Sequence, residues 1–63
     1  MQIGLYNDFI FANTGDGVAR ISLKNKKEQE YLPSDNGDML IYGEDTVLVC
    51  GEAKAEYLVF GKN

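Results

Sequence analysis

The sequence predicts a single all-β domain over residues 1–63, built as a small barrel or compact sandwich of five or six short antiparallel strands. Two observations predict this class. Short apolar runs rich in β-branched and aromatic side chains are separated by clusters of glycine, asparagine and aspartate. One further stretch alternates apolar and polar residues, which is typical of a half-buried strand.

Two short strands are expected at the N-terminus, over Met1–Tyr6 and Phe9–Ala12. Asn7 and Asp8 between them favour a tight hairpin or a bulge within one longer strand. Gly4 marks a bend or a close approach of another backbone segment. The cluster at 13–17 contains two glycines that can adopt positive φ, so we expect a hairpin turn there.

The stretch Val18–Lys24 alternates and predicts a strand with one buried face. The buried face is expected to hold Ala19, Ile21 and Leu23, and the exposed face Arg20, Ser22 and Lys24. The chain turns at residues 25–27, and Glu28–Leu32 is expected to return antiparallel with Gln29 and Tyr31 pointing inward. Glu28 and Glu30 are then expected to form ion pairs with the basic side chains of the neighbouring strand.

Residues 33–38 form the longest irregular segment. Pro33 is expected to stop the preceding strand, and Asn36-Gly37 favours a turn. Asp35 and Asp38 form a candidate metal or catalytic pair, but no further ligands lie nearby, so a solvated loop is expected. No metal site and no cofactor are predicted, and residues 61–63 are expected to fray.

A three-stranded C-terminal meander is predicted over Met39–Tyr42, Thr46–Cys50 and Ala55–Phe60, with glycine-containing turns between the runs. These runs do not alternate. In the middle run, for example, Leu48 falls on one face while valines fall on the other. Both faces of the meander are therefore expected to be covered, either by the first half of the chain or by a copy of the chain.

The small size of the domain limits how its stability can arise. A domain of this size buries only about 60% of the surface of its unfolded chain, and such domains commonly add disulfides, a metal or a partner subunit. Cys50 is the only cysteine and histidine is absent, which excludes an internal disulfide and leaves too few ligands for a structural zinc. Good packing or self-association as a homodimer or higher oligomer is the remaining expectation.

The net charge of −4 argues against binding to nucleic acid or to an anionic membrane. The charge is unevenly distributed. Residues 1–27 carry four basic and two acidic side chains, a net of +2, whereas residues 28–63 carry two basic and eight acidic side chains, a net of −6. No apolar run is long enough to span a bilayer and the start lacks a basic signal segment, so a cytoplasmic protein is expected.

Enzymatic activity is not expected. Without histidine, no Ser–His–Asp or Cys–His arrangement can form, and no phosphate-binding glycine motif is present. Cys50 adjoins no basic residue, so it is expected to be a small buried residue that ends its strand rather than a nucleophile.

The leading functional hypothesis is a non-catalytic protein-binding module, such as a small inhibitor or regulator that occupies a partner's surface. Tyrosine is enriched at interfaces, and acidic side chains near it would suit a basic partner. The candidate surface contains Tyr42, Glu44, Asp45, Glu52, Glu56 and Tyr57. The alternative is a small-anion or nucleotide-binding protein whose site forms between subunits of a homo-oligomer, with Arg20, Lys24 or Lys27 as ligands. Head-to-tail assembly of the basic hairpin with the acidic meander is a third hypothesis.

Overall fold

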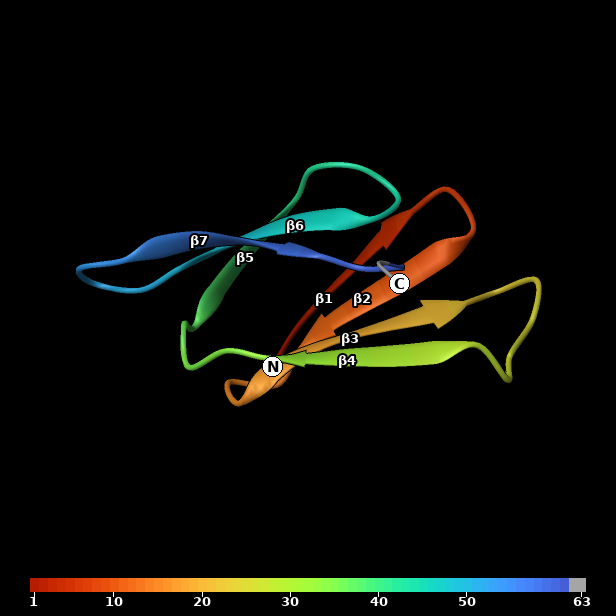
Figure 1. Ribbon diagram of the computed structural model, residues 1–63, viewed down its shortest axis with the longest axis horizontal. Coiled ribbons are helices and arrows are strands. Elements are labelled where there is room, and N and C mark those ends of the chain that lie inside the picture. The colour runs from red at the N-terminus through yellow and green to blue at the C-terminus, as the bar shows by residue number, and fades with distance from the viewer. Residues whose placement is uncertain (62–63) are drawn as a thin grey trace.

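The computed structural model describes residues 1–61, which form seven antiparallel strands in two sheets and no helix. The strands are β1 (Gln2–Tyr6), β2 (Phe9–Asn13), β3 (Gly17–Ser22), β4 (Gln29–Pro33), β5 (Asp38–Ile41), β6 (Thr46–Cys50) and β7 (Ala55–Val59). Strands β1–β4 form sheet A and β5–β7 form sheet B, each joined in chain order (Figure 1). Residues 62–63, part of the expected frayed end, lie outside the described residues.

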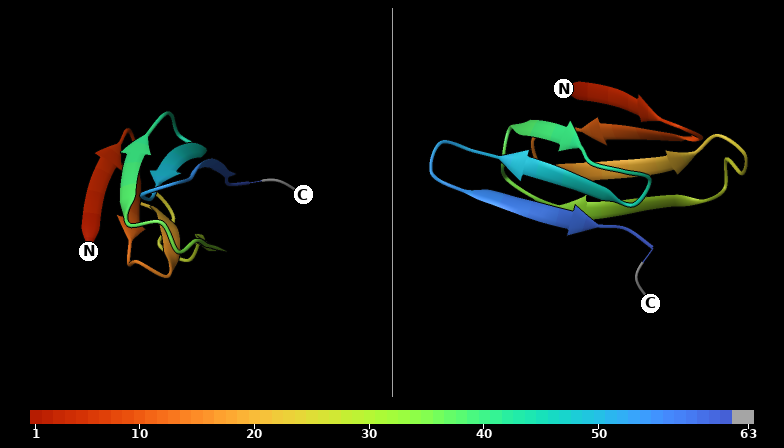
Figure 2. Two further views of the ribbon diagram at one scale, coloured as in Figure 1. Left: turned by 90° about the vertical axis from the view of Figure 1, so that its left-hand side faces the viewer. Right: turned by 90° about the horizontal axis from the view of Figure 1, so that it is seen from above.

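The two sheets pack face to face as an open sandwich. Sheet B lies over sheet A, and the C-terminal meander predicted from the sequence is sheet B itself (Figure 2). The core between the sheets contains Phe11, Val18, Met39, Val47, Val49, Leu58 and Phe60. Phe11 and Phe60 meet edge to face, with ring centroids 5.8 Å apart. The strands do not close into a barrel, and seven strands take the place of the expected five or six.

The N-terminal turns follow from their residues. β1 and β2 pair as a tight hairpin, and Asn7 in the turn has a φ of 50°, a conformation that asparagine tolerates better than most residues. The expected turn after β2 is also present. Gly15 has a φ of 96°, and the Thr14 N–H donates to the Gly17 carbonyl at 3.0 Å. These turns place successive strands of sheet A side by side.

Strands β1 and β5 meet at one corner of the sandwich. A Cβ at Gly4 would overlap Cδ1 of Ile41, so any larger residue here would require the Ile41 side chain to shift. The Gln2 side chain then acts as a substitute for a neighbouring strand. Its Oε1 accepts from the Met39 N–H at 2.7 Å, and its Nε2 donates to the Met39 carbonyl at 3.0 Å. The free edge of β5 is thereby bonded at this position.

The predicted faces of β3 and β4 are reversed in the structure. Val18 is fully buried, and Arg20 and Ser22 share its face toward sheet B. Ala19 and Ile21 face away from sheet B, while Leu23 and Tyr31 are exposed. The prediction was wrong because it assigned the polar residues Arg20 and Ser22 to solvent. Both have partners on the inner face: Arg20 pairs with Glu30, and Ser22 Oγ accepts from the Asn25 N–H at 3.1 Å.

The chain covers one face of the meander and leaves the other open. The inner face, which includes Val47 and Val49, packs on sheet A, whereas Leu40 on the outer face is 62% exposed. The expectation that both faces are covered is therefore not met within one chain. Cys50 ends β6 as predicted, but it lies half-buried on the outer face rather than in the core.

Candidate protein-binding surface

Two predicted tyrosines meet on the outer face of sheet B. The rings of Tyr42 and Tyr57 pack edge to face with centroids 5.7 Å apart, and the side chains are 68% and 56% exposed. Tyr42 directly follows β5 and Tyr57 lies within β7, so the rings meet above the central strand β6. We call the outer-face residues Leu40, Tyr42, Leu48, Tyr57 and Val59 the tyrosine face.

The register of sheet B explains why these side chains share a face. Leu40, Leu48 and Tyr57 are Cα partners across the three strands, and directly opposed residues in antiparallel strands point to the same side. The valines between them point into the core. Large apolar side chains therefore lie on the outer face of sheet B, which does not contribute to the core.

An acidic turn borders one end of the tyrosine face. Glu44 and Asp45 lie between β5 and β6, next to Tyr42. The turn is fixed by bonds to sheet A and to the chain's end. Asn7 Nδ2 donates to Glu44 Oε2 at 2.8 Å, and the Phe60 N–H donates to the Asp45 carbonyl at 2.7 Å. Both acidic residues are exposed to solvent.

The other two predicted acidic residues lie elsewhere. Glu52 is in the turn at the opposite end of β6 from Glu44. Glu56 is the Cα partner of the core residue Val49, and its Oε1 accepts from Ser34 Oγ at 3.3 Å and from Asn36 Nδ2 at 3.4 Å. Glu56 is therefore turned away from the tyrosine face, and the acidic residues do not form one patch.

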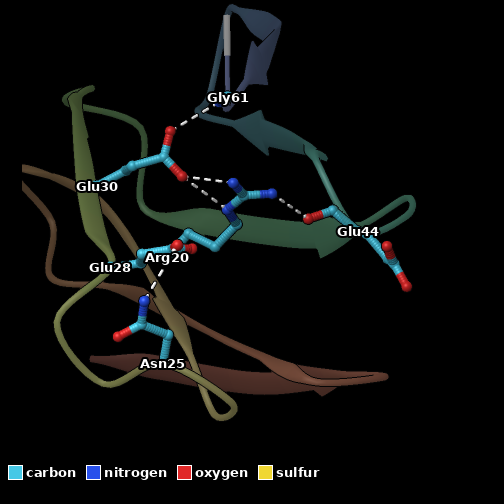
Figure 3. Close-up of polar contacts among 6 residues, drawn as sticks. All are labelled: Arg20, Asn25, Glu28, Glu30, Glu44 and Gly61. Carbon is cyan, nitrogen blue, oxygen red and sulfur yellow. Dashed lines mark hydrogen bonds and ion pairs between the residues drawn. The ribbon is translucent and has the colours of Figure 1, made fainter.

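Arg20 links the acidic turn to sheet A (Figure 3). It forms an ion pair with Glu30, and its Nη1 donates to the Glu44 carbonyl at 2.7 Å. The guanidinium lies 4.3 Å from the Phe9 ring centroid, which suits a cation–π contact. The hydrogen bond from Arg20 is the main reason that the pKa of Glu30 lies below its usual value, and the Gly61 N–H contributes.

Sequence reasoning predicted a pair between Arg20 and a glutamate of the neighbouring strand, but on the exposed face. The two residues are Cα partners, as that prediction required. The pair lies instead on the face of sheet A that packs against sheet B, and the Arg20 side chain is 12% exposed. Its role in holding the Glu44 turn was missed, because no local pattern relates positions 20 and 44.

The three basic residues of the alternative anion site are not brought together in the structure. The Arg20 guanidinium is bonded to Glu30 and to the β5–β6 turn, and Lys24 Nζ lies 3.4 Å from Asp8 Oδ2. Lys27 lies in the exposed loop before β4. The described part of the chain encloses no pocket into which these side chains could converge.

Within residues 1–61, no three cysteine, aspartate or glutamate side chains gather closely enough to hold a metal ion. No membrane-spanning helix occurs in the same range.

The surface that the geometry singles out is thus a pair of exposed aromatic rings among aliphatic side chains, with two carboxylates at one end. Such a surface offers apolar area and polar hydroxyls to another protein. No family model, no curated protein and no solved structure matches the chain.

Proposed function

We propose that the protein is a non-catalytic protein-binding module that uses the tyrosine face to occupy a partner's surface, as an inhibitor or regulator does. The exposed Tyr42–Tyr57 pair carries this proposal. Aromatic side chains that pack on each other in solvent are already ordered, so they lose little conformational entropy when a partner covers them. Tyrosine is also among the residues that most often dominate binding energy.

The charge of the surface indicates the kind of partner. Glu44 and Asp45 border the face, and the whole chain carries a net charge of −4. A protein with an apolar patch next to basic side chains fits this arrangement, and electrostatic attraction would speed its association. Nucleic acid is disfavoured for the same reason. A cytoplasmic location is part of the proposal and rests on the single cysteine.

The test is affinity capture from the source cell lysate with the wild-type chain and matched variants. Tyr57→Ala is expected to lower recovery of the partner at least tenfold, because truncation of a central interface tyrosine typically removes more than about 1.4 kcal/mol of binding free energy. The double variant Glu44→Lys, Asp45→Lys is also expected to lower recovery of the partner. The loss should be larger at low salt than at high salt, because salt screens the interaction between charges.

Tyr31→Ala is the control. Tyr31 is 53% exposed, close to the 56% of Tyr57, but it lies on the outer face of sheet A. Recovery should be retained in this variant. Equal recovery by wild-type, Tyr57→Ala and the charge-reversed chain would contradict the proposed surface.

A further inference from the structure

The outer face of sheet A carries no charged side chain on its strands. The strand positions that face away from sheet B are Ile3, Leu5, Ile10, Ala12, Gly17, Ala19, Ile21, Gln29, Tyr31 and Pro33. A sheet face that stays in water normally carries polar side chains at these alternate positions. A contiguous apolar face of several hundred Å² therefore marks an interaction surface.

This face has a ridge and a trough side by side. One row across the four strands reads Ile3, Ala12, Ala19 and Tyr31, which are consecutive Cα partners. The next row reads Leu5, Ile10, Ile21 and Gln29. Two alanines at the centre of the first row leave a shallow trough, and two isoleucines at the centre of the second row form a ridge of similar length.

We propose that this face binds the same face of a second copy of the chain, forming a two-fold symmetric dimer. A two-fold axis that lies between the two rows and runs parallel to them places the ridge of each copy over the trough of the other. It also places Leu5 of each copy over Ile3 of the other. The usual crossing angle of about 30° between stacked sheets preserves this fit near the centre.

The same axis brings opposite charges together at the ends of the sheet. The loop between β3 and β4, at the ridge end, carries Lys24, Lys26, Lys27 and Glu28, and Lys24 pairs with Asp8 of the β1–β2 turn at the same end. This end therefore keeps a net positive charge. The turn between β2 and β3, at the trough end, carries Asp16 (Figure 1). Because the axis exchanges the two ends, the basic loop of each copy approaches Asp16 of the other. Shape and charge thus indicate the same symmetric arrangement.

The tyrosine face does not pair with itself in this way. It has Glu44 and Asp45 at one end, and Glu52, Lys54 and the outer-face residue Asp38 toward the other, so both ends are net acidic. Stacking two such faces would bring like charges together in either orientation, which is unfavourable. The second copy therefore belongs on sheet A, and this inference does not depend on the proposed partner surface.

The size of the face predicts a weak dimer. Four strands about 4.8 Å apart, with five residues each at about 3.3 Å, span roughly 300–400 Å² in projection. Standard interfaces bury about 800 Å² per partner, so this contact is small and a weak, concentration-dependent dimer is expected. The assembly should also stop at two, because a two-fold contact uses the same face of both copies.

Sedimentation velocity between about 10 µM and 1 mM, a range chosen for a weak dimer, tests the proposal. The wild-type chain should shift from monomer to dimer and no further. Leu5→Lys should weaken dimerisation at least tenfold, since it places a charge in the apolar contact. Leu40→Lys is the matched control, because Leu40 lies on the edge strand of sheet B and is 62% exposed, against 66% for Leu5. The Leu40→Lys variant should dimerise like wild type. Amide NMR spectra of each variant would show that it is folded.

A second set of variants tests the symmetry. Asp16→Lys should weaken the dimer, and adding Lys26→Glu and Lys27→Glu should restore it. Three results would overturn the proposal: a monomer at every concentration, loss of the dimer in Leu40→Lys but not in Leu5→Lys, or growth beyond two copies. The last result would instead support head-to-tail stacking of sheet A on sheet B.

Discussion

Arg20 lies between the two sheets although its charge would usually place it at the surface. Its guanidinium lies 4.3 Å and 5.6 Å from the ring centroids of Phe9 and Phe60, and it donates hydrogen bonds to the Glu30 carboxylate and the Glu44 carbonyl. Arginine suits this position because its head is weakly hydrated and stacks on aromatic rings while it pairs with a carboxylate. One side chain thereby connects sheet A, the acidic turn and the end of β7.

Glu30→Gln tests this connection through its pH dependence. The pKa of Glu30 is lowered in the folded protein, chiefly by the hydrogen bond from Arg20, so the folded state favours the carboxylate. Its contribution is then present above the ordinary pKa of about 4.5 and is lost as the pH falls through the lowered value. We expect Glu30→Gln to reduce the free energy of unfolding by about 1 kcal/mol at pH 7, a modest figure because Glu30 is partly exposed.

The difference between wild type and Glu30→Gln should narrow as the pH falls from 5 to 3, measured by urea denaturation. In an Arg20→Met background, the same substitution should have a smaller effect at neutral pH, because the donor is gone. A difference that stays constant with pH in the wild-type background would show that the Arg20–Glu30 pair does not form as described.

At the scale of the strands, their positions were predictable and their faces were not. The turn residues Asn7, Gly15 and Gly51 separate apolar runs, so the ends of the observed strands lie within a residue or two of the expected ends. The face of β3 was predicted wrongly because Arg20 and Ser22 made one face resemble a solvent face, although Val18 on that face is as apolar as Ile21 on the other. Which one is buried depends on the second sheet, which lies far away in the sequence.

The candidate surface was partly predictable for the same reason. Tyr42 and Tyr57 flank or belong to strands of the predicted meander and were therefore candidates for an interface, but the contact between their rings was not predicted. The orientation of Glu56 was not predictable, because its partners Ser34 and Asn36 come from the connection between the sheets.

Gly4→Ala tests the meeting of β1 and β5. The added Cβ would overlap Cδ1 of Ile41, the end of a flexible side chain that can shift, so we expect a loss of about 1 kcal/mol in the free energy of unfolding. Ile41→Val removes that carbon, so the double variant should recover most of the loss relative to Ile41→Val alone. Gly43→Ala is the control, since its Cβ would meet no atom within 4 Å and should change stability by less than about 0.5 kcal/mol. Equal effects at positions 4 and 43 would rule out the close approach.

At the scale of the whole molecule, the sandwich has two outer faces with large exposed apolar side chains and a small core. Leu5 and Leu40 represent these faces and are exposed to nearly the same extent. If sheet A pairs with a second copy, the dimer becomes four layers deep and presents a tyrosine face on each outer side. Such a dimer could bind two partners at once, and it would gain avidity only where both partner sites can be reached together. Mass action would also make the thermal stability rise with protein concentration.

The assignment of inner and outer faces underlies every proposal, and NOE spectroscopy of the isotope-labelled chain at low concentration measures it directly. We expect strong contacts between the rings of Phe11 and Phe60, and between Val18 and the other core side chains. Contacts from Ile21 or Tyr31 to Val47 would place the opposite face of sheet A inside the sandwich and contradict the account.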